Sequence, residues 1–553
     1  MTLLTSANPE ATEPEPTRND ASEPRNGGAA VAETLKAHGV DVIFGIPGTH
    51  NLEIYRHLVR LGVTTITTRH EQGAGYAADG YTQVAGKPGV VITTSGPAVL
   101  NAMVAAGTSY AESRPVLIIS SGLPSGTDYL DGGELHDTKD TLAAMAAMTE
   151  WSTRATTPQE ASDAVAHAFE VMSTGRPRPV FIEVPHDVLA QAWTGEVSHA
   201  NPVPAPVVDL AAVREAAQLL SEAARPAIIV GGGARGADEQ VRSLAELLSA
   251  PVISTCNGKG VLPETHPLSL GAHIRLVAAR EWLNQSDGLL VVGSELGDSD
   301  LWDGKITAPN LVRVDIAESQ LQLNAAAHTA IHADAAEALS AIIAEVQARA
   351  DTPVLSARST KSGDDIDDLK TRLLAEARAD GEAWYEINSE LREALPENAI
   401  ITGDSSQVTY LGSVHFFPVP RKNSFLYMPR SATLGYAVPA AIGAKVAEPE
   451  APVVALLGDG AFMFSVQELV TAVEQHLPIV VLVMNNGGYR EIKDQQAARG
   501  IAPVGVDLHV PDLPALAAAI GATGERATSA KDAAERARVA LGRSGPTVIT
   551  LDV

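Results

Sequence analysis

Short apolar runs of strand length alternate with longer helical stretches along most of the 553-residue chain, and this pattern occurs in three successive blocks. Single strands joined through helices pair in parallel, and the helices cover both faces of the sheet. We therefore predict an α/β protein of three successive doubly wound parallel-sheet domains. The expected parts are a disordered tail at 1–28 and domains at 29–195, 206–350 and 369–553, with a Pro-rich joint at 199–209 and a polar joint at 351–368.

Charge and composition argue against several classes of function. The formal net charge is −27, whereas proteins that bind nucleic acid or anionic membranes need clustered Lys and Arg. No apolar run approaches the ~18 residues of a membrane span, and the first residues lack the pattern of a signal peptide. The single cysteine, Cys256, allows no intrachain disulfide and is expected to be buried and inert. We expect a cytoplasmic protein that binds a small molecule, and neither nucleic acid nor a membrane.

The third block contains two polar clusters, each at the end of a predicted strand. One apolar strand ends in Gly458-Asp459-Gly460, the next ends in Asn485-Asn486, and 24 residues separate the two clusters. A parallel β-α-β crossover places both strand ends at one edge, where open parallel sheets bind ligands. A carboxylate and an amide oxygen, together with phosphate oxygens, suit octahedral Mg²⁺. Either cluster alone would indicate an ordinary turn, but the pair predicts a metal–diphosphate site.

The sequence between these clusters also contains a possible N-terminal cap for the predicted helix. Ser465 and Glu468 have the spacing of a capping box, in which each side chain hydrogen-bonds the backbone N–H of the other residue. We therefore expect the helix to begin near Ser465.

The two clusters resemble the signature of thiamine-diphosphate (ThDP) enzymes, and a resemblance to the acetolactate synthase and 2-oxo-acid decarboxylase group extends over residues 29–553. It implies a pyrimidine-binding domain, a central nucleotide-fold-like domain and a diphosphate-binding domain, with ThDP and Mg²⁺ as cofactors. It implies that the metal is held by Asp459, Asn486 and the carbonyl of Gly488. The implied coenzyme contacts of this block are Ser405, Ser406, Gln407, Leu434, Gly458, Gly460 and Ala461. Leu434 would support the bent coenzyme, although plain core packing explains it equally well.

In the first block, Arg69-His70-Glu71 follows a predicted strand and begins a helix rich in Gly and Ala. Taken alone, Glu71 would be an exposed carboxylate favoured by the helix N-terminus. The resemblance implies that Glu71 hydrogen-bonds the pyrimidine ring of the coenzyme and activates it, with Gly96 and Asn101 nearby. The small residues at 73–78 fit close helix packing at a subunit contact. In this family two chains build each site, which implies a homodimer or homotetramer.

The second block contains a possible nucleotide signal. Gly231, Gly233 and Gly236 satisfy G-x-G-x-x-G after an apolar strand, which is typical of dinucleotide-binding loops. The next strand ends in Thr255-Cys256-Asn257 and supplies no acid for a ribose. FAD, which acetolactate synthases bind in this domain, is therefore possible but not favoured.

The resemblance is strongest to 5-guanidino-2-oxopentanoate decarboxylases, which implies non-oxidative release of CO₂ and an aldehyde from a 2-oxo acid. The shared stretches are 44–58, 69–81, 135–140, 297–302 and 433–445. Acetolactate-forming carboligation of two 2-oxo acids, a transferase reaction, is the alternative, although the segment at 487–496 departs from that pattern. A non-catalytic ThDP-fold binding protein is a third, minor alternative.

Four further side chains are candidates for substrate chemistry. His50 and His136 could be catalytic acids or could bind the substrate carboxylate, and a structural role is as plausible for each. Asp298 and Asp300 could pair with a cationic substrate tail, or they could be solvated loop acids.

Overall fold

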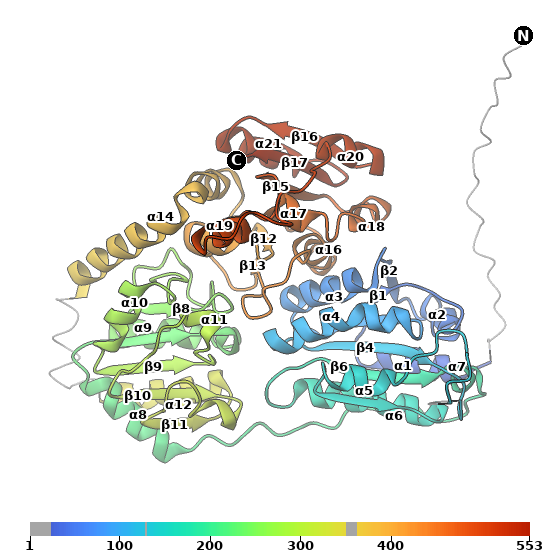
Figure 1. The fold of residues 1–553 in the computed structure, drawn as a ribbon. Coiled ribbons are helices and arrows are strands. Elements are labelled where there is room, and N and C mark those ends of the chain that lie inside the picture. Colours follow the sequence, from blue (N-terminus) through green and yellow to red (C-terminus); the bar gives the residue numbers. More distant parts are fainter. Residues whose placement is uncertain (1–23, 128–129, 350–361) are drawn as a thin grey trace, which may run out of the picture.

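Three parallel sheets follow one another along the chain in the computed structural model, each with helices on both faces (Figure 1). The structure describes residues 24–127, 130–349 and 362–553. The predicted fold class is confirmed. Most of the predicted tail and the joint at 351–361 lie outside the described residues.

The first domain contains a six-stranded sheet of order β2-β1-β3-β4-β6-β5. Its strands are β1 (Val42–Gly45), β2 (Thr64–Thr67), β3 (Gly89–Thr93), β4 (Val116–Gly122), β5 (Trp151–Arg154) and β6 (Val180–Pro185). Its helices are α1 (Gly27–Ala37), α2 (Leu52–Leu58), α3 (Glu71–Ala85), α4 (Pro97–Glu112), α5 (Thr141–Ala146), α6 (Pro158–Ser173) and α7 (His186–Ala190).

The central domain contains a five-stranded sheet of order β11-β10-β9-β7-β8. Its strands are β7 (Pro226–Val230), β8 (Val252–Ser254), β9 (Gly288–Val292), β10 (Leu311–Asp315) and β11 (Thr329–His332). Its helices are α8 (Leu210–Glu222), α9 (Asp238–Leu248), α10 (Val277–Asn284), α11 (Asp298–Leu301) and α12 (Ala335–Gln347), with short 3₁₀ turns η1 (Gly232–Ala234) and η2 (Glu318–Gln320).

The third domain repeats the topology of the first, with the order β13-β12-β14-β15-β17-β16. Its strands are β12 (Ile400–Gly403), β13 (Phe425–Leu426), β14 (Val453–Gly458), β15 (Ile479–Asn485), β16 (Thr523–Ala527) and β17 (Thr547–Asp552). Its helices are α14 (Ser362–Ala394), α15 (Val414–Phe416), α16 (Ala437–Ala447), α17 (Asp459–Phe462), α18 (Glu468–Glu474), α19 (Arg490–Ala498), α20 (Leu513–Ile520) and α21 (Ala530–Ala540), with a π-helical turn η3 (Val408–Ser413).

Two predicted boundaries need correction. Helix α1 begins at Gly27, because the Asn26 side chain accepts a hydrogen bond from Ala29 N, so residues 27 and 28 do not belong to a tail. Both glycines are buried, and a Cβ at Gly27 would collide with the backbone of α7 and one at Gly28 with the backbone of α2. The predicted start of the third domain at 369 falls inside α14, which begins at Ser362.

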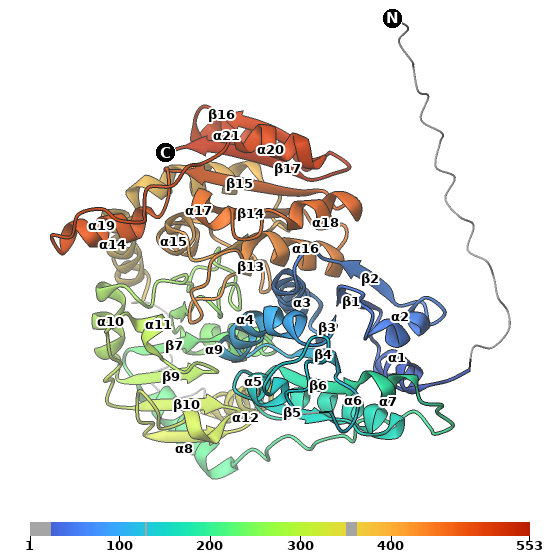
Figure 2. The ribbon, with the colours of Figure 1, turned by 45° about the vertical axis from the view of Figure 1, so that its right-hand side comes forward.

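The first and third domains share one hydrophobic core, in which α3 packs on α16 (Figure 2). The contact is close because glycines face backbone: a Cβ at Gly80 would collide with the Ala440 carbonyl, and one at Gly443 with the Ala77 carbonyl. The prediction that the small residues of α3 form a subunit contact is therefore wrong for these faces, which are buried within one chain.

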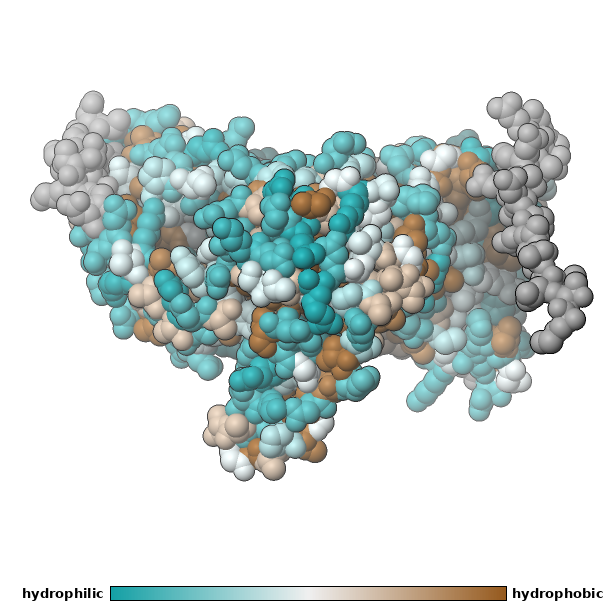
Figure 3. Space-filling model, turned by 90° about the horizontal axis from the view of Figure 1, so that it is seen from above, coloured by the Kyte–Doolittle hydropathy of each residue, from teal (hydrophilic) through white to brown (hydrophobic). Residues whose placement is uncertain are grey.

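The outer surface is polar where the third domain faces solvent. Seen from above, that face is mostly hydrophilic with small, separate hydrophobic areas (Figure 3). Among the described helices, none combines the length and the apolar character that crossing a membrane requires. Cys256 is buried as predicted, and burial raises the pKa of its thiol to about 11.

Candidate active site

The two polar clusters of the third domain lie side by side. Strands β14 and β15 pair in parallel with Gly458 opposite Met484, so Asp459 and Asn486 follow at the same edge. The backbone N–H of Asn486 points at Asp459 Oδ1 at 3.4 Å. The predicted β-α-β geometry is confirmed, and it brings one carboxylate and one amide to the carboxyl edge of the sheet.

Three oxygens converge at this edge without a hydrogen-bond donor between them. The Asn486 amide oxygen lies 3.1 Å from Asp459 Oδ1 and 3.1 Å from the Gly488 carbonyl oxygen. Neighbouring ligands of octahedral Mg²⁺, at 2.0–2.1 Å from the metal, lie about 2.9 Å apart. In the reversed orientation Nδ2 would donate to both oxygens, so the amide reaches both in either orientation, and a bound cation would favour the one with its oxygen turned inward.

The donor set also suits a hard cation. Asp459 Oδ2 is buried and has no hydrogen-bond partner, and burial raises the pKa of this carboxyl. Within the described ranges no group of three His, Cys, Asp or Glu side chains could hold a metal. A metal here would therefore combine one carboxylate with two neutral oxygens and the oxygens of a diphosphate, which Mg²⁺ accepts.

A glycine-lined cradle surrounds these oxygens. Gly458 N donates to Ser406 Oγ at 2.9 Å, and Ser406 Oγ donates to Asp404 Oδ1 at 2.6 Å. A Cβ at Gly460 would lie 2.8 Å from Tyr489 Cε1, and Gly488 has a φ of +138° in a position where a Cβ would collide with the Val506 carbonyl. At these positions glycine lets the chain pack directly against Tyr489 and Val506.

A cavity of about 570 Å³ opens on the cradle. It is lined by all the predicted diphosphate and metal contacts, namely Ser405, Ser406, Gln407, Leu434, Gly458, Asp459, Gly460, Ala461, Asn486 and Gly488. Leu434 is half-buried at the cavity and is absent from the hydrophobic core, which favours the supporting role over plain packing. Trp302, Tyr410 and Glu491, which the sequence did not single out, line the same cavity.

A second group of predicted residues lies at the carboxyl edge of the first sheet. His70 caps α3 by accepting a hydrogen bond from Gln72 N, which leaves Glu71 half-buried in the first helical turn. Asn101 Nδ2 donates to Glu71 Oε2 at 2.9 Å. Gly96 adopts a φ of +60°, and a Cβ there would lie 2.8 Å from the His136 Cβ. These contacts join Glu71, Asn101, Gly96 and His136 in one region.

His50 and His136 belong to a histidine cluster at the same edge. Ser95 Oγ lies 2.6 Å from His50 Nδ1 and 3.1 Å from His136 Nδ1, so it links the two rings. His186 stacks on His50 with 4.6 Å between ring centroids. Burial, followed by the charges of His186 and His136, lowers the pKa of His50. His186 was missed by sequence reasoning, although its position directly after β6 at the ligand edge could have indicated it.

One chain does not bring the two groups together. Among the described residues, none of Glu71, His50, His136, Gly96 and Asn101 lines the cavity that contains Asp459.

The predicted capping box is wrong. Helix α18 begins at Glu468, and Ser465 Oγ is buried without a partner. The Glu468 carboxylate instead accepts from Arg69 N and from Thr471 Oγ1, and burial raises its pKa. This carboxylate thereby ties the third domain to the segment that precedes Glu71.

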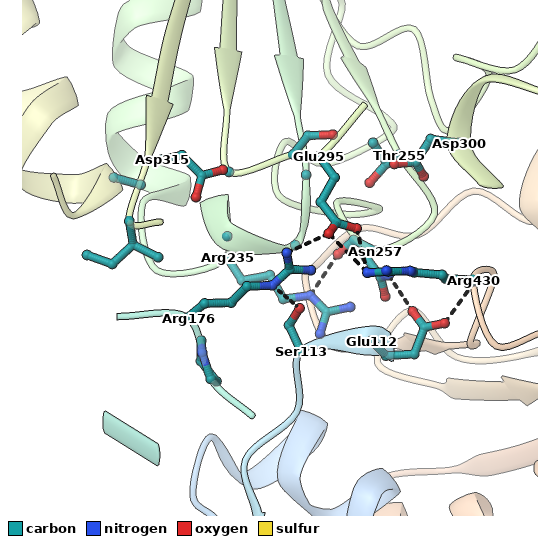
Figure 4. A pocket seen from close by; sticks show the side chains of 18 of the residues that line it. Glu112, Ser113, Arg176, Arg235, Thr255, Asn257, Glu295, Asp300, Asp315 and Arg430 are labelled. Atoms are coloured by element: carbon teal, nitrogen blue, oxygen red, sulfur yellow. Dashed lines mark hydrogen bonds and ion pairs between the residues drawn. The ribbon is translucent and has the colours of Figure 1, made fainter. Parts of the chain in front are cut away.

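A second cavity, of about 340 Å³, lies where the central domain meets the other two (Figure 4). The glycine loop at 231–233 lines it, and Arg235 Nε donates to the Asn257 carbonyl at 2.8 Å. Glu295 accepts hydrogen bonds from both Arg176 and Arg430 across the cavity wall. The strand that follows the glycine loop supplies no acid for a ribose, as the sequence indicated. Asp315, at the end of β10, nevertheless lines this cavity.

The two acids predicted for a cationic substrate tail lie away from the metal cluster. Asp300 lines the second cavity, and burial raises its pKa to about 7. Asp298 Oδ1 accepts a hydrogen bond from Asp303 N. Neither lines the cavity of Asp459, and Asp298 is exposed, as expected of a solvated loop acid; pairing of either acid with a cationic tail stays a prediction.

Three family models match the chain. They are the thiamine pyrophosphate enzyme N-terminal TPP binding domain at residues 25–145, the central domain at 213–342 and the C-terminal TPP binding domain at 405–551. A crystal structure described as a thiamin diphosphate-dependent enzyme from Mycobacterium smegmatis matches with a TM-score of 0.79 at 22% identity, over 96% of this chain and 99% of that one. This likeness shows the shared fold.

Two curated relatives match nearly the whole chain. The probable 2-ketoarginine decarboxylase AruI of Pseudomonas aeruginosa is 37% identical, over 95% of this chain and 93% of the relative. The probable acetolactate synthase large subunit of Methanocaldococcus jannaschii is 32% identical, over 95% and 91%.

Proposed function

Because the chain belongs to the thiamine pyrophosphate enzyme family, and is therefore a ThDP-dependent enzyme, we propose that it decarboxylates a 2-oxo acid without oxidation. The products would be CO₂ and an aldehyde. The first candidate substrate is 5-guanidino-2-oxopentanoate, the compound also called 2-ketoarginine. The 37% identical relative is a probable 2-ketoarginine decarboxylase.

The observation that carries the proposal is the convergence of Asp459 Oδ1, Asn486 Oδ1 and the Gly488 carbonyl in a glycine-lined cavity. These three oxygens would hold Mg²⁺, and the backbone at 458–461 with Ser406 would hold the diphosphate. Leu434 would support the coenzyme from below. When bound, the coenzyme supplies the carbon nucleophile and the electron sink that decarboxylation needs.

The residues of the first domain would handle protons. Glu71, held by Asn101, would exchange a proton with the pyrimidine nitrogen. His50 and His136, linked through Ser95, would hold a proton near the carbon that becomes the aldehyde. Since these groups do not line the cavity of Asp459 in one chain, we propose a homo-oligomer in which a partner subunit completes each site.

Carboligation to acetolactate is the second candidate, because acetolactate synthases match at 32% identity over almost the same length. The test is a panel of 2-oxo acids given to the purified protein with ThDP and Mg²⁺. Release of CO₂ and aldehyde from the guanidino acid supports decarboxylation, and acetolactate from pyruvate supports carboligation. No turnover of any basic or aliphatic 2-oxo acid would contradict the proposed decarboxylase.

A further inference from the structure

Glu491 presents a carboxylate to the cavity that contains the metal cluster. It lies in the first turn of α19, which is the first helix after Asn486. It lines this cavity together with Asp459 and Trp302. Its Oε2 accepts hydrogen bonds from Gln407 Nε2 at 2.8 Å and Tyr410 Oη at 2.9 Å, and its Oε1 accepts one from Gln495 Nε2 at 2.8 Å. Three donors fix the position of this carboxylate.

The charge of Glu491 is not neutralised by a neighbouring cation. All three of its donors are neutral, and no Lys, Arg or His of the described chain forms an ion pair with it. Arg490 pairs with Asp494, and Lys493 pairs with Asp507. Burial raises the pKa of Glu491, but the hydrogen bonds from Gln495, Gln407 and Tyr410 outweigh it and leave the pKa below its usual value. Glu491 is therefore a partly buried anion that lacks a counter-charge.

Aromatic rings line the same cavity as this carboxylate. Trp302 and Tyr410 line the cavity with their ring centroids 6.4 Å apart and edge-to-face. The Arg275 guanidinium lies 4.3 Å from the Trp302 ring and donates to His415, not to Glu491. This stacking shows that the indole accepts a guanidinium group, and Trp302 remains 45% exposed beside it.

We propose that Glu491 selects 2-oxo acids with a cationic tail, by pairing with a guanidinium group while Trp302 and Tyr410 border it. The proposal rests on the decarboxylase function above and names the residue that sets its substrate class. Oε2 already accepts two hydrogen bonds and Oε1 accepts one, so a guanidinium can donate a charge-assisted hydrogen bond to the remaining site on Oε1. A neutral urea can donate the same hydrogen bond but without the attraction between opposite charges. The proposal gives Glu491 the kind of pairing that the sequence also allows for Asp298 and Asp300.

The alternative is a purely structural role, in which Glu491 only braces Gln407 and Tyr410. The variant Glu491→Gln separates the two roles, because it keeps the size of the side chain and removes its charge. Glu535→Gln, the same change at an exposed position of α21, is the matched control. The substrates are 5-guanidino-2-oxopentanoate and its neutral isostere 5-ureido-2-oxopentanoate, given to holoenzyme with ThDP and Mg²⁺.

We expect the wild-type enzyme and Glu535→Gln to prefer the guanidino acid by about 10- to 100-fold in kcat/KM. In Glu491→Gln this preference should fall below about threefold, through a higher KM for the guanidino acid. Its kcat/KM for the ureido acid should fall much less than its kcat/KM for the guanidino acid. An equal loss for both substrates, or a wild-type enzyme that does not distinguish them, overturns the proposal even if 2-oxo acids are decarboxylated.

A binding measurement keeps this test separate from the proposed reaction. Calorimetric titration with 5-guanidinopentanoate, which lacks the reactive 2-oxo group, should show binding to wild-type holoenzyme and at least tenfold weaker binding to Glu491→Gln. ThDP uptake by the variant should be unchanged. If no 2-oxo acid is turned over, the proposed decarboxylase fails, and this titration alone still decides whether Glu491 binds a guanidinium. Equal binding to both proteins overturns the inference.

Discussion

Asn101 Nδ2 donates a 2.9 Å hydrogen bond to Glu71 Oε2, which joins α4 to the first residue of α3. The bond fixes the orientation of the Glu71 carboxyl group at the ligand edge of the first sheet. This is the geometry that a residue exchanging a proton with a bound ring requires.

Replacing Glu71 by Gln should lower turnover by about 100-fold or more, because the amide cannot exchange the proton. Folding and Mg-dependent coenzyme uptake should survive, since the amide occupies the same volume. Steady-state CO₂ release and thermal unfolding measure the two effects. Unchanged turnover would show that Glu71 is not the proton-exchanging residue.

Replacing His50 or His136 by Gln should slow aldehyde release by about 10- to 1,000-fold while leaving coenzyme uptake intact. The reason is that Ser95 holds both rings at the ligand edge, where a proton must be delivered. His167→Gln, at an exposed histidine of α6 that pairs with Glu170, is the control. If both variants keep wild-type aldehyde release, the cluster has only a structural role.

Asp404 should make stability depend on pH. Burial raises its pKa to about 7, against the hydrogen bonds from Ser406 and Gly435 N. A buried carboxyl group with a raised pKa stabilises the folded state fully below the pKa of the unfolded chain, about 3.9. This stabilisation is lost as the pH rises through the folded-state pKa of about 7. The melting temperature of Asp404→Asn, relative to wild type, should therefore increase between about pH 5 and pH 8. A difference that stays constant over this range would contradict the assignment.

The purified protein should contain no flavin, and added FAD should not raise its melting temperature. Arg176 and Arg430 both pair with Glu295 at the wall of the central cavity, and a dinucleotide would have to break these pairs (Figure 4). The visible absorption spectrum and a thermal-shift titration check this. A flavin spectrum in the pure protein would show that the central domain binds the cofactor.

The sequence predicted those parts of the fold and site whose position follows from the local pattern of apolar residues. The apolar strands before Asp459 and Asn486 are buried on both faces, so their pattern gave the parallel sheet and its ligand edge. Strands β5 and β16 are edge strands that are half-buried or polar, so they carry little apolar signal in the sequence.

Side-chain partners were harder to predict, because loops from distant parts of the chain decide them. Glu468 has the spacing of a cap but binds Arg69 N, 399 residues earlier in the chain. Asp300 and Trp302 are two residues apart, yet they line different cavities. Likewise, only the fold shows that His186 stacks on His50 and that Glu491 accepts a hydrogen bond from Tyr410.

The central claim is that Asp459 and Asn486 hold a cation that binds the coenzyme diphosphate. Calorimetric titration of the folded protein with ThDP, with and without Mg²⁺, tests it most directly. We predict saturable binding that requires Mg²⁺ and is lost in Asp459→Asn. Binding that is absent with Mg²⁺ present, or is unaffected by Asp459→Asn, would contradict the account.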